Sequence, residues 1–287
     1  MERITLTTPA LKDYALLDSG EGEKLERYGA WILARPDPQA LWQKEHGKDL
    51  WDKAHGRYVR TGNTGTWQTS TDFPSAWNIT IDSLRFLIRP TSFKHTGLFP
   101  EQLSNWQWSR EVIKKTSNPV SVLNLFGYTG AATLAAAQAG AQVVHLDASK
   151  TAVQWARENA VLSELQEKPI RWIVEDTLTF VRRELKRGHT YDAIIMDPPA
   201  FGHGPDDELW KIEEDFIALI ELSKQLLSPD PLFFLINGYA AGYSSLAFAY
   251  NLSFLKGGIL EHGDLTIQQE ESARMLPCGI FARWKRD

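Results

Sequence analysis

The order of apolar and polar residues divides the chain into two parts. Up to about residue 90, short apolar runs alternate with turn residues, as in "YALLDSG", "YGAWILARP", "GTWQTS" and "WNITIDSLRFLIRP". Short runs separated by turns at close intervals predict a small β structure. From about residue 100, apolar runs of strand length alternate with longer amphipathic segments. This second pattern is typical of a parallel sheet that helices cover on both faces.

The second part predicts strands and helices in alternation. Its helices are amphipathic or alanine-rich, with Ser149 as an N-cap and Gly140 as a helix end. The predicted strands are 120–126, 141–147, 170–176, 191–197, 231–237, 259–270 and 279–284, and the predicted helices are 100–116, 130–140, 149–165, 177–188, 207–227 and 244–254. We therefore expect an α/β fold. A Rossmann-like seven-stranded sheet would occupy residues 91–287, after a small β-rich N-terminal domain at residues 1–90.

Composition places the chain among soluble globular proteins. Of its 287 residues, 43% are apolar and 23% charged. The net charge of −5 counts against a protein that only coats nucleic acid, although it does not exclude a local basic surface. The single cysteine, Cys278, excludes a disulfide framework within the chain. The seven histidines lack ligand spacing, so we expect no metal.

One uncharged stretch, Val120 to Val144, is long enough to span a bilayer. Glycines at 127, 130 and 140 divide it, however, and this punctuation predicts a strand, a turn and a helix. The N-terminus shows no apolar core behind a basic flank, so we expect no secretory signal. The expected location is the cytoplasm.

Three predicted strands in succession end in an aspartate. Asp147, Asp176 and Asp197 each follow an apolar run. Ligands of open α/β sheets bind outside the carboxyl ends of the strands, so these side chains would point into one crevice. A single such residue is commonplace, whereas three on consecutive strands predict a binding site.

The loop "FGYTG" after the first of these strands predicts a nucleoside cofactor. Gly127 and Gly130 permit a tight turn and a close approach of the backbone to a ligand. Asp147 follows Gly127 by 147 − 127 = 20 residues, a spacing that suits ribose hydroxyls. NAD is one candidate, but Thr129 stands where a dinucleotide fingerprint has its middle glycine. The loop therefore favours S-adenosylmethionine, which has no pyrophosphate.

Together these motifs resemble the class I S-adenosylmethionine-dependent methyltransferases. The segments are "FGYTGAATLAAAQAGAQVVHLDASKTAVQWARENA", "EDTLTFV" and "YDAIIMDPPAFG". They are most similar to bacterial large-subunit ribosomal RNA methyltransferases with F-x-Y-T-G, D-x-S and D-P-P-x-F. The segment "KHTGLFPEQLSNW" at 94–106 resembles one that precedes the Rossmann-like domain in that family. The resemblance covers about residues 85–287 and is weaker before them.

The resemblance implies a set of cofactor-binding residues. The loop after the first strand would line the methionine end, Asp147 would hold the ribose, and Asp176 with Thr177 the adenine. Thr96, Phe99 and Gln102 would close over the cofactor, although core packing for Phe99 and an exposed helix position for Gln102 stay open. The full set is Thr96, Phe99, Gln102, Phe126, Gly127, Tyr128, Thr129, Gly130, Asp147, Ala148, Asp176, Thr177 and Asp197.

The same resemblance implies that Asp197, Pro198, Pro199 and Phe201 are the catalytic residues. The carboxylate and the first proline's carbonyl would accept hydrogen bonds from an amine and orient its lone pair toward the methyl group. The prolines fix φ and remove N–H groups, so the loop stays rigid and rich in acceptors. Phe201 could stack on a base turned out of its helix. A rigid turn with a core phenylalanine is the alternative.

Methyl transfer to a pyrimidine carbon would need a cysteine thiolate. Relatives with that activity resemble Ser-Cys-Ser after the fifth strand, where this chain has Asn237-Gly238-Tyr239. Cys278 opens the last strand and is better explained as a buried structural residue. We therefore predict transfer to a base nitrogen, or to oxygen, of ribosomal RNA.

The segment 41–60 interleaves aromatic and basic residues, and 181–189 is a second basic patch. Contacts from Lys48, Lys53 and Arg57 would suit structured RNA, whereas a solvated helix face with buried tryptophans is the alternative. The remaining alternatives are a methyltransferase for a small molecule or a protein side chain, which the acidic composition favours, and a silent cofactor-binding RNA or assembly factor.

Overall fold

The computed structural model describes residues 1–62, 64–239 and 242–287, which form two compact units. The first unit comprises Met1–Leu6, Ser104–Asp264 and Gly279–Asp287. The second comprises Thr7–Leu103 and Leu265–Cys278. Each unit thus joins segments that are far apart in the sequence. The division into domains 1–90 and 91–287 remains a prediction.

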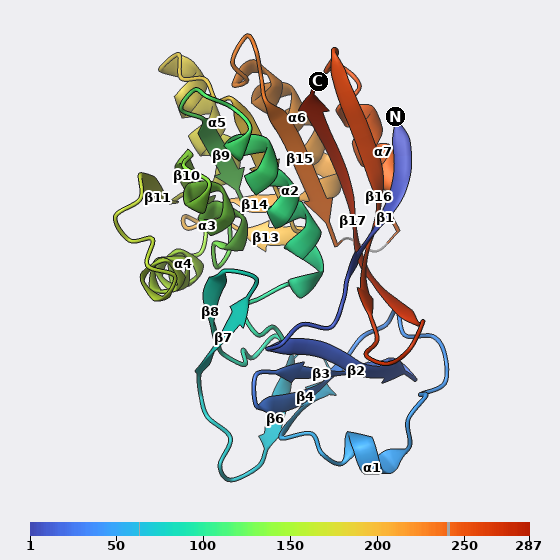
Figure 1. Ribbon diagram of the computed structural model, residues 1–287. Helices are drawn as coiled ribbons and strands as arrows, with labels where there is room; N and C mark the ends of the chain where they lie inside the picture. The colour runs from blue at the N-terminus through green and yellow to red at the C-terminus, as the bar shows by residue number, and fades with distance from the viewer. Residues whose placement is uncertain (63, 240–241) are drawn as a thin grey trace. The chain divides into compact units, whose positions relative to one another are not determined.

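The first unit is built on a mixed sheet with the strand order β1-β16-β17-β15-β12-β9-β10-β11 (Figure 1). All seven predicted strands are present, which confirms the Rossmann-like sheet. β1 adds an edge strand that the sequence did not predict. The strands are β1 (Glu2–Thr8), β9 (Ser121–Leu125), β10 (Gln142–Asp147), β11 (Ile170–Val174), β12 (Ala193–Met196), β15 (Phe233–Gly238), β16 (Gly258–Gln268) and β17 (Met275–Arg286).

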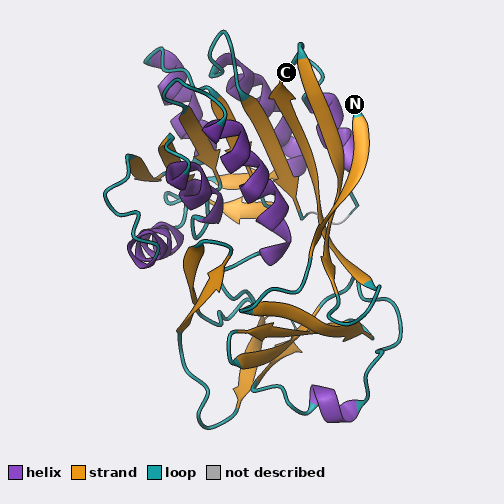
Figure 2. Ribbon diagram, in the orientation of Figure 1, coloured by secondary structure: helices purple, strands orange, loops and turns teal. Residues whose placement is uncertain are grey.

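Helices cover both faces of this sheet (Figure 2). Alternate strand residues face opposite cores: Ile195 and Leu235 pack with α2 and α3, whereas Ile194 and Ile236 pack with α5, α6 and α7. This alternation is the period of two that a strand buried on both faces requires. The helices are α2 (Leu103–Lys114), α3 (Ala131–Gln138), α4 (Lys150–Leu162), α5 (Thr177–Lys186), α6 (Ile212–Gln225) and α7 (Ser245–Asn251).

The helix predicted at 207–227 is too long at its start. α6 begins at Ile212, and the residues before it form a hairpin of β13 (Phe201–His203) with β14 (Leu209–Lys211). Three acidic residues fill the first turn of α6, and Asp215 accepts a hydrogen bond from the backbone N–H of Lys211 at 2.9 Å. The favourable interaction of these carboxylates with the helix dipole explains the observed start.

The uncharged stretch Val120 to Val144 folds as β9, α3 and β10, as its glycines predicted. In the part of the chain that the structure describes, no helix has the length and apolar character needed to cross a membrane.

The second unit is rich in β structure, as predicted for the N-terminal part of the chain. It has a five-stranded sheet in the order β2-β3-β4-β5-β6 and a separate hairpin, β7-β8. Its elements are β2 (Tyr14–Gly20), β3 (Glu23–Tyr28), β4 (Trp31–Pro36), α1 (Lys48–Trp51), β5 (Gly56–Thr61), β6 (Thr64–Thr69), β7 (Trp77–Ile81), β8 (Leu84–Ile88) and the 3₁₀ helix η1 (Pro100–Gln102).

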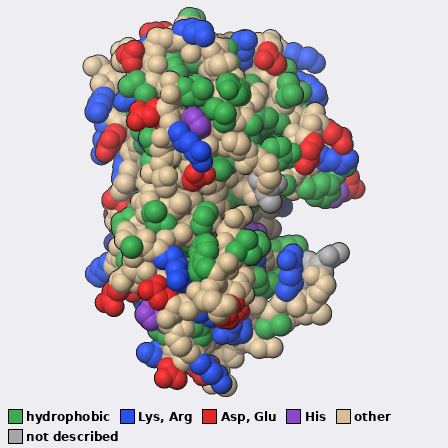
Figure 3. Space-filling model, turned by 90° about the vertical axis from the view of Figure 1, so that its right-hand side faces the viewer, with side chains coloured by type: hydrophobic (Ala, Val, Ile, Leu, Met, Phe, Trp, Pro, Cys, Tyr) green, Lys and Arg blue, Asp and Glu red, His purple; other side chains and the backbone are tan. Residues whose placement is uncertain are grey.

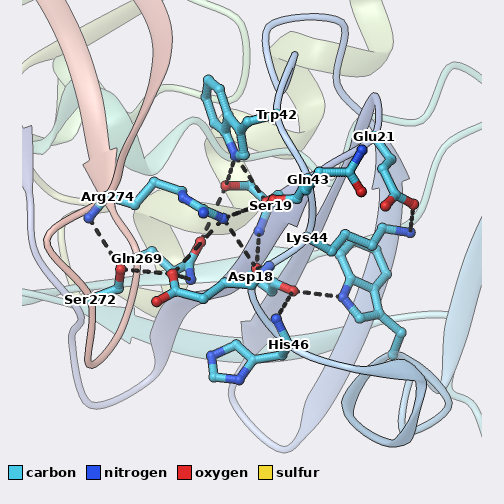
Figure 4. A network of polar contacts seen from close by, with 12 residues as sticks. Asp18, Ser19, Glu21, Trp42, Gln43, Lys44, His46, Gln269, Ser272 and Arg274 are labelled. Carbon is cyan, nitrogen blue, oxygen red and sulfur yellow. Dashed lines mark hydrogen bonds and ion pairs between the residues drawn. The ribbon is translucent and has the colours of Figure 1, made fainter.

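The buried carboxylate of Asp18 fixes the segment around α1 to β2 (Figure 4). It accepts hydrogen bonds from the backbone N–H groups of Ser19, Glu45 and His46 at 2.8, 3.2 and 3.0 Å. It also accepts one from the indole Nε1 of Trp51 at 2.8 Å. Trp51 is therefore a structural residue of the second unit.

The segment Leu265–Cys278 completes the second unit from the other end of the chain. Gln269 pairs with Leu16 in a β-bridge, and the hydroxyl of Ser19 donates a hydrogen bond to Oε1 of Gln269 at 3.3 Å. Arg274 Nη1 donates to the carbonyl oxygens of Ser19 and Gln43, each at 3.2 Å (Figure 4). These contacts join residues that are more than 200 positions apart in the sequence.

A buried ionic cluster centres on Glu26. Its carboxylate accepts hydrogen bonds from Arg35 Nε at 2.8 Å and from the hydroxyl of Tyr14 at 2.9 Å. Burial alone would raise the pKa of Glu26, but Arg35 and Lys24 lower it to about 2. Because this pKa lies below the ordinary 4.5, Glu26 stabilises the fold above pH 4.5 and loses that contribution as the pH falls toward 2.

We predict that Arg35→Met destabilises the protein by about 3–5 kcal/mol, since it leaves the buried charge of Glu26 without its main partner. Urea unfolding followed by circular dichroism measures the change. Arg60→Met, at an exposed position, removes the same charge and should shift the unfolding midpoint little. Equal effects of the two variants would show that the buried pair has no special role.

Candidate functional site

The sheet reverses its strand order beside β9. β10 and β11 follow on one side of β9, and β12 and β15 on the other. All five strands are parallel, and Leu125 at the end of β9 is level with Leu146 of β10 and Met196 of β12. The loops after these strands therefore leave one edge of the sheet together, at the switch point where α/β sheets bind ligands.

The loop after β9 has an unusual backbone. Phe126, Tyr128 and Gly130 have φ values of 56°, 48° and 89°, in the left-handed region. Gly130 lies against α4, where an added Cβ would come within 2.9 Å of the Cβ of Ala156. At Gly127 an added Cβ would lie 2.5 Å from the ring of His145. The two glycines are thus required by packing beneath the loop.

A buried polar network that the sequence did not predict supports this loop. The amide of Asn124 donates to the hydroxyl of Thr133 at 2.8 Å, and that hydroxyl lies 2.8 Å from Nδ1 of His145. Burial lowers the pKa of His145 to about 3, so its imidazole is neutral beneath Gly127 at physiological pH. Only the three-dimensional structure brings these residues together, because none belongs to the glycine motif.

Asp147 is held as an acceptor at the end of β10. Its carboxylate oxygens accept hydrogen bonds from the backbone N–H groups of Tyr128 and Ser149, each at 2.8 Å. Burial raises the pKa of Asp147, and the two hydrogen bonds oppose that rise. Each oxygen keeps a further lone pair, so the carboxylate fits the vicinal hydroxyls of a ribose.

The N-terminus of α3 fits a ligand carboxylate. α4 and α5 begin with side-chain caps, in which Ser149 accepts from the backbone of Ala152 and Asp176 from that of Thr179. α3 begins at Gly130 without such a cap. Its first backbone N–H groups and the positive end of its dipole face the loop, as an anion requires.

The remaining predicted residues of the first unit lie around these groups. The carbonyl of Thr129 accepts from the amide of Asn159 at 2.9 Å, and Thr177 is buried at the start of α5. Ala148 lies between Asp147 and the Ser149 cap. The Phe126 ring lies 5.0 Å from the ring of Trp210, between centroids.

The Asp-Pro-Pro loop leaves β12 next to the glycine loop. The backbone N–H of Asp197 donates to the carbonyl of Leu125 at 3.3 Å, which ties the two loops together. Trp210 Nε1 donates a hydrogen bond to the carbonyl of Pro199 at 2.7 Å. The backbone N–H of Ile212 donates one to the carbonyl of Ala200 at 3.1 Å.

The carbonyl oxygen of Pro198 differs from these two carbonyls. Among residues 1–62, 64–239 and 242–287, no group donates a hydrogen bond to it. The ring of Phe201 is 55% exposed, on the hairpin that follows. The loop therefore presents an open acceptor next to a carboxylate and an exposed ring.

Three predicted cofactor residues belong to the second unit. Thr96 and Gln102 are buried there, so Gln102 is not at an exposed helix position, and Phe99 is partly buried beside His95 with ring centroids 5.5 Å apart. Their contact with a cofactor remains a prediction. Cys278 also lies in this unit, and burial raises the pKa of its thiol. A raised pKa disfavours the thiolate that a nucleophile requires.

Comparison with known proteins also identifies a methyltransferase that uses S-adenosylmethionine. Residues 33–247 match the family described as S-adenosylmethionine-dependent methyltransferase. The chain is 36% identical to the SAM-dependent methyltransferase from Agrobacterium tumefaciens. The two structures superpose with a TM-score of 0.95, and the match covers 100% of this chain and 95% of the other. SMU.776, titled a putative methyltransferase complexed with SAH, is 20% identical. It shares the fold, with a TM-score of 0.72 over 96% of this chain and 76% of its own.

One relative is named for its substrate. The ribosomal RNA large subunit methyltransferase K/L of Shewanella sp. (strain MR-4) is 33% identical over 149 residues, which are 51% of this chain and 20% of the relative. The chain thus spans about a fifth of the length of this relative.

We predict that Gly127→Ala weakens SAH binding by about tenfold or more, because the new Cβ displaces His145 and shifts the loop. Isothermal titration with SAH measures the affinity. Gly47→Ala is the control, since a Cβ there meets nothing within 4 Å. Unchanged SAH affinity of Gly127→Ala would contradict a cofactor role of this loop.

Proposed function

The chain belongs to the family of S-adenosylmethionine-dependent methyltransferases, and on this basis we propose that it methylates a base nitrogen in ribosomal RNA. The observation that carries this proposal is the open carbonyl of Pro198 next to the carboxylate of Asp197. Two acceptors side by side suit an amine, which has two N–H groups to donate.

Positioning would provide most of the catalysis. S-adenosylmethionine, when bound, supplies an electrophilic methyl group. Asp197 and the carbonyl of Pro198 would each accept an N–H of the amine and so direct its lone pair toward the glycine loop. The hydrogen bonds to Pro199 and Ala200 keep the loop in place. The nitrogen would gain the methyl group as the bond between that group and the cofactor's sulfur breaks, which leaves SAH. One proton of the nitrogen would pass to the carboxylate of Asp197.

Phe201 would hold the base. Its exposed ring stands on a short hairpin and makes an edge-on contact with His203 at 5.2 Å between centroids. Exposed aromatic rings near a catalytic loop stack on bases that have been turned out of a helix. More than half of the ring is exposed and is therefore available to a base.

The name of the curated relatives supports ribosomal RNA as the substrate, whereas the surface charge supports it only at a few positions. Both signs of charge are mixed on the face shown in Figure 3, so no single basic surface dominates it. Arg57 forms an ion pair with Glu23 at 2.8 Å, and Lys44 lies over the Trp51 ring at 3.8 Å. These groups serve the fold of the second unit.

The exposed cations Lys48 and Lys53 are better placed for phosphates than Arg57. In the described part of the chain neither has an ion pair or hydrogen bond of its side chain. Arg182 and Lys186, in the second basic patch, are exposed in the same way. A cytoplasmic location follows from this proposal, since ribosomal RNA is there.

We predict that the purified protein transfers tritiated methyl groups from S-adenosylmethionine to ribosomal RNA from cells lacking it. Digestion and chromatography should place the label in one methylated nucleoside. Asp197→Ala should lower the turnover by about 100-fold or more. Asp230→Ala is the control, because that side chain is 81% exposed at the amino end of β15.

SAH titrations on the same variants separate catalysis from cofactor binding. A loss of label that only follows a loss of SAH affinity would assign Asp197 to the cofactor. No label in RNA, with SAH binding intact, would contradict the proposal and direct the search to a small molecule, a protein side chain or a silent assembly factor.

We also predict that Lys48→Glu with Lys53→Glu lowers the affinity for ribosomal RNA and reduces its dependence on salt, because about two phosphate contacts are lost. Filter binding at several salt concentrations measures both quantities. Lys114→Glu with Lys115→Glu makes the same charge change at exposed positions of the first unit. Equal losses in the two double variants would indicate an effect of net charge alone.

A further inference from the structure

A chain of buried polar groups runs to the carboxyl end of β15. Arg283 of β17 donates from Nε to Glu261 at 2.7 Å and from Nη1 to Oδ1 of Asn105 at 3.1 Å. Nδ2 of Asn105, on α2, donates in turn to Oδ1 of Asn237 at 2.8 Å. Asn105 and Asn237 are almost completely buried.

This chain fixes the orientation of both amides. Arginine only donates hydrogen bonds, so the oxygen of Asn105 must face Arg283. The NH₂ group of Asn105 then faces Asn237 and requires an oxygen there. Nδ2 of Asn237, with its two N–H groups, must therefore point away from Asn105.

The NH₂ group of Asn237 makes no hydrogen bond with residues 1–62, 64–239 or 242–287. The residue is 2% exposed, so these donors have little access to water. A donor with so little access to water and no partner among these residues carries a cost that an apolar residue at this position would avoid. A ligand bound at this edge of the sheet would supply the partner that the described residues lack.

Asn237 lies on the Asp197 side of the switch point. Met196 of β12 is level with Ile236 of β15, so Asp197 and Asn237 are the next neighbours on adjacent strands. Ile195 and Leu235, two residues earlier, both face α2 and α3, and the alternation places Asp197 and Asn237 on that same face.

The predicted nucleoside-binding carboxylates lie on the opposite side of the switch point. Asp147 follows β10 and Asp176 follows β11, whereas β15 is separated from β10 by β12 and β9. A group that reaches Asn237 past Asp197 is therefore remote from the nucleoside of the cofactor. It lies beside Asp197 and the Pro198 carbonyl, the groups that would hold the methyl acceptor under the proposed function.

We propose that Nδ2 of Asn237 donates a hydrogen bond to the methyl-accepting base and helps to select it. The proposal rests on the proposed function. The exocyclic amines of adenine, cytosine and guanine are each attached to a carbon that also carries a ring nitrogen with a free lone pair. Asp197 and the Pro198 carbonyl would hold the amine, while Asn237 would hold that ring nitrogen. The two acceptors, Asp197 and the Pro198 carbonyl, would thus recognise the amine, and the donor, Asn237, would recognise the ring nitrogen next to it.

Asn237→Asp tests this directly, because a carboxylate can still accept from Asn105 but cannot donate. We expect kcat/KM for ribosomal RNA to fall by about tenfold to hundredfold, with SAH affinity unchanged within about twofold. Lowering the pH should restore part of the activity relative to the wild type, since a protonated carboxyl group donates again. Asn118→Asp, exposed near the amino end of β9, is the matched control.

A second measurement does not depend on the folding of a variant. Once the labelled nucleoside is known, RNA is made in which CH replaces the ring nitrogen next to the methylated amine. We expect kcat/KM of the wild-type enzyme to fall on this RNA by a factor similar to that of the Asn237→Asp substitution. On the same RNA, the substitution should lower kcat/KM little further.

Several outcomes would overturn the inference while leaving the proposed function in place. The first is full activity of the wild type on the CH-substituted RNA. The second is that the effects of Asn237→Asp and of the CH substitution on kcat/KM multiply when they are combined. The third is that Asn237→Asp lowers the affinity for SAH as much as it lowers kcat/KM. Absence of RNA methylation by the wild-type protein would instead remove the proposed function, on which the inference depends.

Discussion

The parallel pairing of β9 with β12 on one side and β10 on the other determines where chemistry can take place in this protein. It sets Leu125, Leu146 and Met196 level with one another, so that three loops begin at the same height. The glycine loop, the Asp147 carboxylate and the Asp-Pro-Pro loop are close because of this register and not because of sequence proximity. A shift of one residue in either pairing would turn every side chain to the other face.

Residues on the two sides of this register have different tasks. Beneath the glycine loop, the neutral ring of His145 and the amide of Asn124 fill the space that a side chain at Gly127 would need. Across the switch point, the relay from Arg283 through Asn105 holds an amide in one orientation. Both devices fix the position of groups that would otherwise move, which is how a site lowers the entropic barrier of a transfer between two bound molecules.

The sequence predicted the seven strands, because most of them are apolar runs bounded by glycine, proline or a charged residue. It also predicted the carboxylates of Asp147 and Asp197 at strand ends, which parallel pairing places at one edge of the sheet. Asp176, predicted as the end of a third strand, is instead the N-cap of α5. The sequence could not predict the hairpin before α6, where three-residue strands carry no periodic signal, or the polar residues that meet only after folding. His145, Thr133 and Asn105 lie in segments whose pattern is that of an ordinary buried strand or helix, and nothing local marks them as partners.

The participation of residues 265–278 in the second unit has a consequence for synthesis. Gln269 and Arg274 bond to Leu16, Ser19 and Gln43, which leave the ribosome more than 200 residues earlier. The N-terminal segment must therefore remain incomplete until almost the whole chain has been translated. Such long-range closure is slow to form and leaves apolar surface open in the meantime. For the same reason the two units cannot be exchanged between proteins as simple cassettes, since a cut at any single position separates strands that belong together.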